Sequence, residues 1–205
     1  MKKMFLLLTI VLVSLTSYSQ ARVGVRGGVN FADLTNLETT KKIDFYGGVF
    51  LAIRASEAYT FQPEITYSFQ GATLDSNKTL RIENKGLKDL KLEFLSITFI
   101  NKLTTKSNVN FLIGPYIDIR MFDNVQNDGY FLEGLFPRMD IGLQLGFGYD
   151  INDSFAIEAR FKQGFADMLN ENDIYQDYNH DESNFNQIFQ VGIAYKFKLK
   201  QTKKQ

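Results

Sequence analysis

His180 is the only histidine of the 205-residue chain, and it lies beside residues that could join it in nucleophilic chemistry. The segment 177–183 reads Asp-Tyr-Asn-His-Asp-Glu-Ser, so a serine, a histidine and acids occur close together. A lipid-modifying enzyme could use such a set. Catalytic groups need rigid support, however, and this polar segment offers none. We therefore interpret it as a loop tip, and no catalytic residue is assigned.

The same segment contains the beginning of a calcium-loop pattern, Asp177-x-Asn179-x-Asp181. The glycine that the pattern requires next is replaced by Glu182, and its twelfth position is Ile188 instead of glutamate. A single histidine and the absence of cysteine exclude multi-histidine and thiolate metal centres. Two interpretations remain, a weak surface site for a divalent ion and, as the better account, a solvated acidic loop. No metal or cofactor is assigned.

A third candidate consists of charged residues at even positions of strand-like segments. Its carboxylates could be read as acid–base pairs. Arginines occupy the same face, so an ion-pair network inside a closed sheet is the better interpretation, and it would plug the lumen against free ion flow. The predicted network comprises Arg26, Glu64, Asp118, Arg138, Asp140, Glu158 and Arg160.

These charges lie on strands whose opposite face is apolar. In 59–70 every odd position is apolar and every even position is polar, which is typical of a strand with one apolar face. The pattern predicts eight antiparallel strands: Arg22–Phe31, Ile43–Arg54, Tyr59–Gln70, Leu90–Leu103, Val109–Arg120, Pro137–Ile151, Ser154–Gly164 and Ile188–Leu199. Their connections are tight after the second, fourth and sixth strands and long after the others. Short periplasmic turns opposite longer outer loops are typical of a transmembrane β-barrel.

Volume decides which face points outward. The lumen of an eight-stranded barrel is only wide enough to be filled by side chains, so the large odd-numbered residues would not fit inside. We expect an odd face without charges to meet lipid, and the even face, with its charges and most strand glycines, to line the lumen. The segment near Phe94 is apolar on both faces, which predicts a bulge or a phase slip there.

The two ends of the chain differ from the strands. Lys2, Lys3, an apolar run and Ser17-Tyr18-Ser19 predict a cleaved signal peptide over 1–19. The barrel is expected over 20–199, followed by a polar tail over 200–205. Equal numbers of basic and acidic residues give no electrostatic reason to expect nucleic acid as a partner.

Several strands carry motifs that resemble a known family. Val23–Phe31 resembles a glycine-rich first strand, Phe111–Tyr116 a fifth strand with Gly-Pro-Tyr, and Asp140–Gly148 a sixth strand. The sequence in this respect is similar to the small outer-membrane β-barrel proteins of gram-negative envelopes, the PorT-type outer membrane protein β-barrel domain. Leu92–Ile97 lies where the family usually carries a leucine-rich strand with a proline, and here the proline is absent.

The resemblance implies an all-β fold, an eight-stranded antiparallel up-and-down transmembrane β-barrel, in the outer membrane. It also implies that the last strand carries a sorting signal for the barrel-insertion machinery, formed by Gly192, Tyr195 and Phe197, although Phe197 is not the final residue. Outer-membrane lipid and lipopolysaccharide are the other expected partners, and a divalent ion at Asp177, Asn179 and Asp181 could bridge lipopolysaccharide phosphates.

The sequence leaves several functions open. We favour a non-enzymatic envelope protein with a structural or surface-binding role through its outer loops, which could bind an envelope or extracellular protein or ligand. The alternatives are an accessory factor of a secretion or envelope-assembly system, a lipid-modifying barrel enzyme using His180, and a soluble lipocalin-like carrier.

Overall fold

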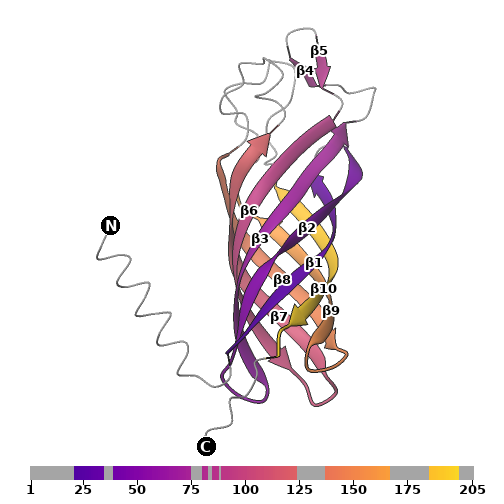
Figure 1. The fold of residues 1–205 in the computed structure, drawn as a ribbon. Helices are drawn as coiled ribbons and strands as arrows, with labels where there is room; N and C mark the ends of the chain where they lie inside the picture. Colours follow the sequence, from indigo (N-terminus) through magenta and orange to yellow (C-terminus); the bar gives the residue numbers. More distant parts are fainter. Residues whose placement is uncertain are drawn as a thin grey trace, which may run out of the picture.

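A closed β-barrel dominates the structure, a computed structural model that describes residues 21–34, 39–74, 80–82, 85–87, 89–123, 137–166 and 185–198 (Figure 1). Eight strands form the wall: β1 (Ala21–Leu34), β2 (Thr39–Arg54), β3 (Tyr59–Leu74), β6 (Asp89–Thr104), β7 (Val109–Asp123), β8 (Met139–Asp150), β9 (Phe155–Gly164) and β10 (Asn186–Lys196). Each pairs antiparallel with its neighbour in this sequence order, and β1 pairs with β10 to close the ring. The predicted eight-stranded antiparallel up-and-down barrel is confirmed. None of the described residues forms a helix that could cross a membrane.

Two features at the loop end differ from the prediction. A small hairpin of β4 (Leu80–Ile82) and β5 (Lys85–Leu87) interrupts the connection between β3 and β6, above the barrel wall (Figure 1). In addition, β1 and β2 stay paired as far as Ala32 and Lys42, so most of the predicted first long connection belongs to strands. The strands rise further on this side than their apolar pattern indicated.

At the opposite end, short connections join the strands, as predicted, and each has four residues. In the turn between β6 and β7, the Thr105 N–H donates to the Val109 carbonyl at 2.8 Å, and Asn108 adopts a left-handed φ of 62°. Asparagine tolerates this region better than most residues. Between β8 and β9, the Asn152 side chain accepts hydrogen bonds from the backbone N–H groups of Ser154 and Phe155 at 2.8 and 2.9 Å. Local side-chain chemistry therefore fixes these turns.

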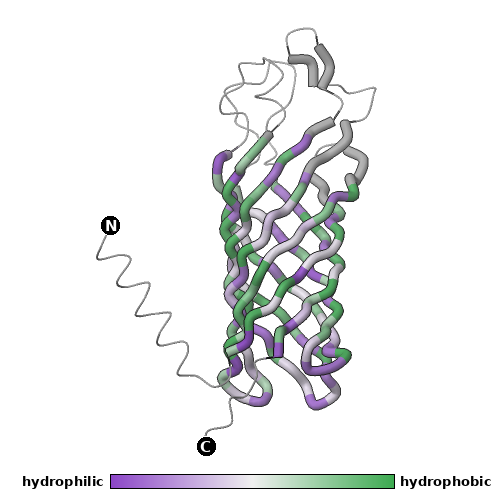
Figure 2. Tube along the Cα trace, viewed as in Figure 1, coloured by the Kyte–Doolittle hydropathy of each residue, from purple (hydrophilic) through white to green (hydrophobic). Residues whose placement is uncertain are grey.

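Residue parity separates the two faces of the wall. Every buried residue of the described segments has an even number, and every exposed large hydrophobic side chain among them has an odd number. The alternation is visible along the strands in Figure 2. Parity survives from strand to strand because paired residues on each shared face, such as Arg26 with Gly48 and Ser96 with Asp118, are both even. The predicted orientation, odd residues outward, is confirmed.

The pairing of β6 with β7 contains one irregularity. Glu93 pairs with Phe122 whereas Phe94 pairs with Arg120, so Met121 is the extra residue. The expected bulge near Phe94 is thus present, but it lies on the neighbouring strand and β6 keeps its phase. Both faces of β6 are apolar here because Phe94 fills the lumen while Leu95 faces outward.

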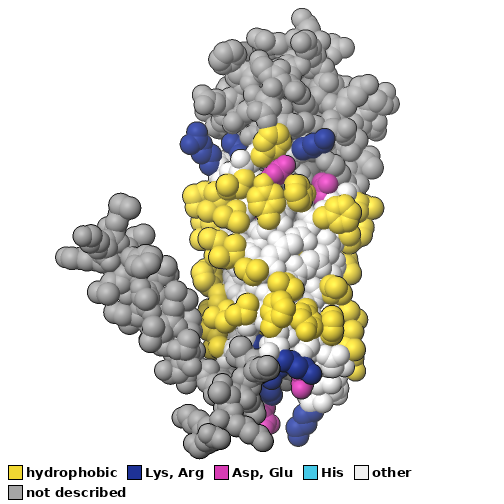
Figure 3. Space-filling model, in the orientation of Figure 1, with side chains coloured by type: hydrophobic (Ala, Val, Ile, Leu, Met, Phe, Trp, Pro, Cys, Tyr) yellow, Lys and Arg dark blue, Asp and Glu magenta, His cyan; other side chains and the backbone are white. Residues whose placement is uncertain are grey.

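The outer surface is apolar between two charged ends. Figure 3 shows hydrophobic side chains in bands along the wall, uncharged surface between them, and charged side chains near the two ends. One expectation is wrong in detail: the odd residues Lys91 and Glu93 of β6 point outward, at the loop end, where the Tyr67 hydroxyl donates to Glu93. A soluble carrier would need the apolar face inward, which is the opposite of the arrangement found.

Candidate functional site

Four charged side chains form a central network inside the barrel: Arg26 on β1, Glu64 on β3, and Glu158 and Arg160 on β9. Both terminal nitrogens of Arg160 donate to the two Glu64 carboxylate oxygens at 2.9 Å, and Nη2 also lies 2.7 Å from Glu158. Arg26 pairs with the same Glu64 carboxylate. Because β3 and β9 are opposite one another in the ring, the Arg160–Glu64 pair crosses the lumen.

Neutral side chains complete this central network. The Gln62 amide donates to Glu64 Oε1 at 2.7 Å, and Arg26 Nη2 donates to the Tyr46 hydroxyl at 3.1 Å. All four charged residues are at least nine-tenths buried. Burying charges is tolerated only where partners of opposite sign compensate the lost hydration, and here each charge has such a partner.

A second ion pair lies nearer the loop end. Lys162 Nζ on β9 is 2.9 and 2.8 Å from the two oxygens of Asp118 on β7, and 4.1 Å from the centroid of the Tyr116 ring. Lys162 Nζ also donates to the Ser96 hydroxyl at 3.2 Å. The predicted network omitted Lys162. Its even number and its place two residues after Arg160 indicate that it lies on the same inward face.

The remaining predicted network residues have different surroundings. Asp140 is buried, accepting a hydrogen bond from the Tyr116 hydroxyl at 3.2 Å and one from the Ala166 N–H at 3.1 Å. Arg138 precedes the first residue of β8 and its side chain is exposed. Its inclusion in the lumen network is wrong, because the strand that would direct it inward begins only at Met139.

Apolar side chains lie above and below these charges. On the loop side, Leu92, Phe94 and Ile188 are at most 3 % exposed. On the turn side, Phe50, Ile100 and Leu112 are similarly buried. Glycine allows this filling: a methyl group at Gly192 would overlap the Tyr46 hydroxyl and the Gly27 backbone. The middle of the lumen is therefore filled by interlocking side chains.

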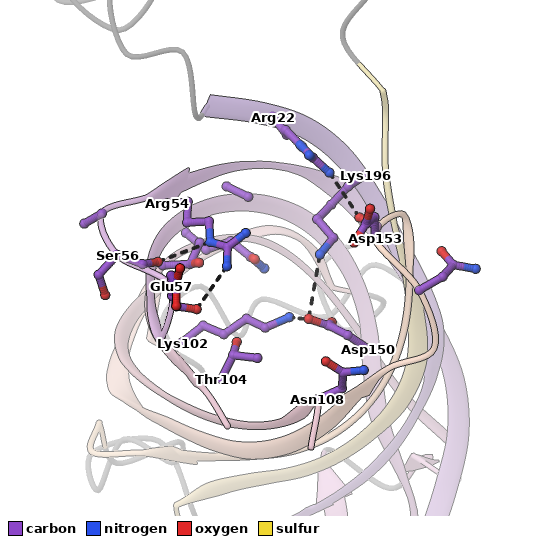
Figure 4. Close-up of a pocket in the computed structure, with 15 residues that line it drawn as sticks. Arg22, Arg54, Ser56, Glu57, Lys102, Thr104, Asn108, Asp150, Asp153 and Lys196 are labelled. Carbon is purple, nitrogen blue, oxygen red and sulfur yellow. Dashed lines mark hydrogen bonds and ion pairs between the residues drawn. The ribbon is translucent and has the colours of Figure 1, made fainter. Parts of the chain in front are cut away.

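The turn end of the lumen contains a cavity of about 680 Å³. We call it the turn-end vestibule, and its wall includes Arg22, Arg54, Lys102, Asn108, Asp150 and Lys196 (Figure 4). Asp150 Oδ1 accepts from Lys102 Nζ at 2.8 Å, and Lys196 Nζ lies 3.8 Å from Asp150 Oδ2. The sequence did not predict this cavity. An even residue number indicates that a side chain faces inward, but not whether the inward side chains fill the lumen at that height.

Arginines at the rim of the turn-end vestibule bind backbone carbonyls. Arg54 donates from Nε to Ser56 O and from Nη2 to Glu57 O, both at 3.2 Å (Figure 4). Arg22 Nη1 donates to Asp153 O at 3.3 Å. Among the described residues neither guanidinium has an ion pair with a carboxylate.

The residues of the predicted sorting signal occupy two faces of the last strand. Gly192 faces the lumen, whereas Tyr195 and Phe197 are on the outside with ring centroids 5.2 Å apart. The Phe197 N–H donates to Val23 O at 2.9 Å, which helps close the barrel.

The candidate ion site, Asp177, Asn179 and Asp181, and His180 lie outside the described residues. Within the described part of the chain, no group of acidic or histidine side chains is placed to hold a metal ion.

Comparison with known proteins adds to this geometry. No curated protein matches the sequence. Neisserial surface protein A shares 12% identity over 87% of this chain and 98% of its own, with a TM-score of 0.49. Ail of Yersinia pestis shares 8% identity over 86% of this chain and 97% of its own, with a TM-score of 0.45. OprG of Pseudomonas aeruginosa shares 13% identity over 87% of this chain and 97% of its own, with a TM-score of 0.44.

The family described as "Outer membrane protein beta-barrel domain" matches residues 16–170, most of the chain. This match agrees with the closed eight-stranded barrel and its apolar outer wall, and it points to the outer membrane. The chain belongs to the outer membrane protein beta-barrel domain family.

Proposed function

We propose that this chain is a non-enzymatic outer-membrane protein whose barrel is a closed, rigid support for a binding surface at its loop end. The observation that carries the proposal is the Arg160–Glu64 pair, which spans the lumen between opposite strands. A channel needs a continuous aqueous path, and this pair occupies the place where the path would run.

Opening such a path would be costly. A solute would have to separate ion pairs that are shielded from water, and breaking one buried pair typically costs about 3–5 kcal/mol. It would also have to displace Phe94 and Ile188, neither of which is exposed to solvent. These costs favour a supporting role for the wall over transport through it.

The lengths of the connections favour the loop end of the barrel as the binding surface. The connections between β7 and β8 and between β9 and β10 span 124–138 and 165–185, whereas the turns at the other end have four residues each. Binding residues are often carried on loops held by a rigid scaffold. Lipopolysaccharide and an extracellular or envelope ligand are the partners we propose for this surface.

Conductance across a planar lipid bilayer tests the closed lumen. We expect the purified protein to insert without producing stepwise currents. A variant that combines Glu64→Ala, Arg160→Ala and Phe94→Ala serves as the sensitivity control, because removing the bridge together with an apolar side chain that blocks the lumen should raise the current above the wild-type baseline. Stable wild-type channels would overturn the proposal.

Epitope labelling tests the orientation. An epitope inserted within residues 171–183 should be labelled on intact cells, and one inserted in the turn at 55–58 only after the outer membrane is permeabilised. The reverse pattern would place the binding surface on the wrong side. For the enzymatic alternative, His180→Ala should leave the lipid A profile unchanged, and a changed profile would contradict a non-enzymatic role.

A further inference from the structure

The turn-end vestibule has the size and shape of a ligand site. Its volume of about 680 Å³ lies within the range of small-molecule pockets, roughly 300–1,000 Å³. It opens between the turns, which face the periplasm in outer-membrane barrels. Its inner wall includes Gln62, whose amide holds Glu64 of the central network, so a ligand entering from the turn side would stop there.

Positive charge in this space exceeds what the described carboxylates neutralise. Asp150 serves both Lys102 and Lys196. Arg22 and Arg54 have only carbonyl partners among the described residues, and a carbonyl carries no formal charge. Those carbonyls do hold the two guanidinium groups in place, which leaves further N–H groups available to a ligand. Glu57 and Asp153 also line the space, so four cations face three carboxylates, and neither guanidinium forms an ion pair with a carboxylate of the described residues.

Two unpartnered polar groups lie directly behind the lining of this space. Thr104 lines the turn-end vestibule and donates to Asn110 Oδ1 at 2.7 Å. Asn110 itself is fully buried, and its amide Nδ2 has no hydrogen-bond partner. Ser154, next to the lining residue Asp153, is also buried with an unpartnered hydroxyl. Unpaired buried polar groups are rare and usually mark a strained or functional place.

The arrangement of these groups selects among anionic ligands. Arg22 and Arg54 lie on the neighbouring strands β1 and β2, where Arg22 pairs with Ala52, and the Lys102–Asp150 pair lies further round the opening (Figure 4). One carboxylate or phosphate would fill a small part of the space. Thr60, Gln62 and Asn152 offer donors and acceptors that match peptide amide groups.

We infer that the turn-end vestibule binds an acidic peptide segment of another envelope protein, presented from the periplasmic side. Carboxylates of the segment pair with Arg54 and Arg22, and its backbone contacts the neutral side chains elsewhere on the wall. The chain's own C-terminal residues are a poor occupant, because Lys200, Lys203 and Lys204 have the same charge as the rim arginines.

Fluorescence anisotropy of the full-length protein in nanodiscs tests this inference. The probe is a labelled short peptide alternating glutamate and serine, compared with the same peptide in which glutamine replaces glutamate. We expect the acidic peptide to bind, the glutamine peptide to bind at least about tenfold more weakly, and binding to weaken with salt. Equal binding of the two peptides would overturn the inference.

Arginine substitutions test whether the peptide binds in the turn-end vestibule. Arg22→Gln with Arg54→Gln should weaken binding at least about tenfold, while Arg138→Gln, an exposed arginine at the loop end, should leave it unchanged. Heat-modifiable migration of each variant shows that the barrel is folded. Unchanged binding in the double variant, or equal loss in Arg138→Gln, would contradict the assignment.

Two controls cover other sources of binding. Deleting residues 199–205 should preserve binding, and a loss would mean that the basic tail holds the peptide. Inorganic phosphate, added at the peptide's own concentration, should fail to displace it. Full displacement would show a phosphate site and overturn the peptide assignment.

Discussion

The middle of the lumen and its turn end are built from the same even-numbered face, yet they differ in charge balance and in filling. In the middle, Arg160 and Lys162 reach carboxylates on other strands and are at most 1% exposed. At the turn end, the arginines Arg22 and Arg54 are held by backbone carbonyls, and a cavity remains. A polar inward face therefore produces either a filled lumen or a cavity, and residue parity alone does not distinguish the two.

Side-chain size explains part of the difference. The inward-facing residues Glu158 and Arg160 of β9 have long side chains. The next inward-facing residue toward the turn end is Ala156, whose side chain is short. Ala156 lies in one buried cluster with Ala52, Ala194 and Phe50. Since Ala52 also lines the turn-end vestibule, small residues at this level leave space that longer ones occupy in the middle.

The largest expected effect compares two carboxylates that each serve two cations. Glu64→Ala would leave Arg26 and Arg160 buried with less compensation, and we expect it to lower the free energy of unfolding by about 3–5 kcal/mol. Urea unfolding in lipid vesicles, followed by heat-modifiable migration, measures the change.

Asp150→Ala is the matched control at the turn end. Asp150 has Lys102 and Lys196 as partners, but its side chain is 16% exposed and water can reach the site. We expect a loss of about 1 kcal/mol. Similar losses for both variants would remove the distinction between a sealed middle and an open end.

The next effect concerns the two faces of β6. Phe94 is fully buried in the lumen and Phe99 is 41% exposed on the outer wall. Phe94→Ala should cost about 3 kcal/mol, because it loses transfer free energy and leaves a cavity. Phe99→Ala should cost about 1–2 kcal/mol, because lipid chains fill the gap and only the transfer free energy is lost. The same unfolding assay compares them, and a larger loss for Phe99 would contradict the assigned orientation.

Sequence reasoning predicted the barrel because its signals are local. Alternation in 59–70 fixes which side chains share a face, and the four-residue turns preserve parity from one strand to the next. Strands β4 and β5 were missed because three residues are too few to display a period. Lys91 and Glu93 lie outward because β6 continues past the apolar part of the wall.

The sequence predicted which residues face the lumen, but not which of them contact each other. Glu64, Glu158 and Arg160 were identified by parity, yet their contacts depend on the height of each strand around the ring, which spacing within one strand does not give. Arg138 has the right parity but lies outside its strand. The turn-end vestibule depends on where small residues from β2, β9 and β10 coincide, which is a property of register.

A smaller effect compares the two ends of β10. Phe197 and Phe189 are both outward and about equally exposed, at 45% and 46%. Alanine at either position should therefore cost a similar free energy of unfolding, about 1–2 kcal/mol. If Phe197 belongs to a sorting signal, Phe197→Ala alone should reduce the amount of folded barrel in the outer membrane. Equal membrane yields for the two variants would contradict that role.

A comparably small effect tests how the turns hold the turn-end vestibule. Asn108 has a φ of 62° and also lines the cavity. Asn108→Val should cost about 1–2 kcal/mol, because a β-branched side chain is strained in the left-handed region. Asn108→Gly removes the same amide but accepts that backbone, so its unfolding free energy should stay within about 0.5 kcal/mol of wild type. Urea unfolding of both variants separates the backbone conformation from the lost side chain. Equal losses would mean that the Asn108 amide, and not its backbone conformation, stabilises this end of the barrel.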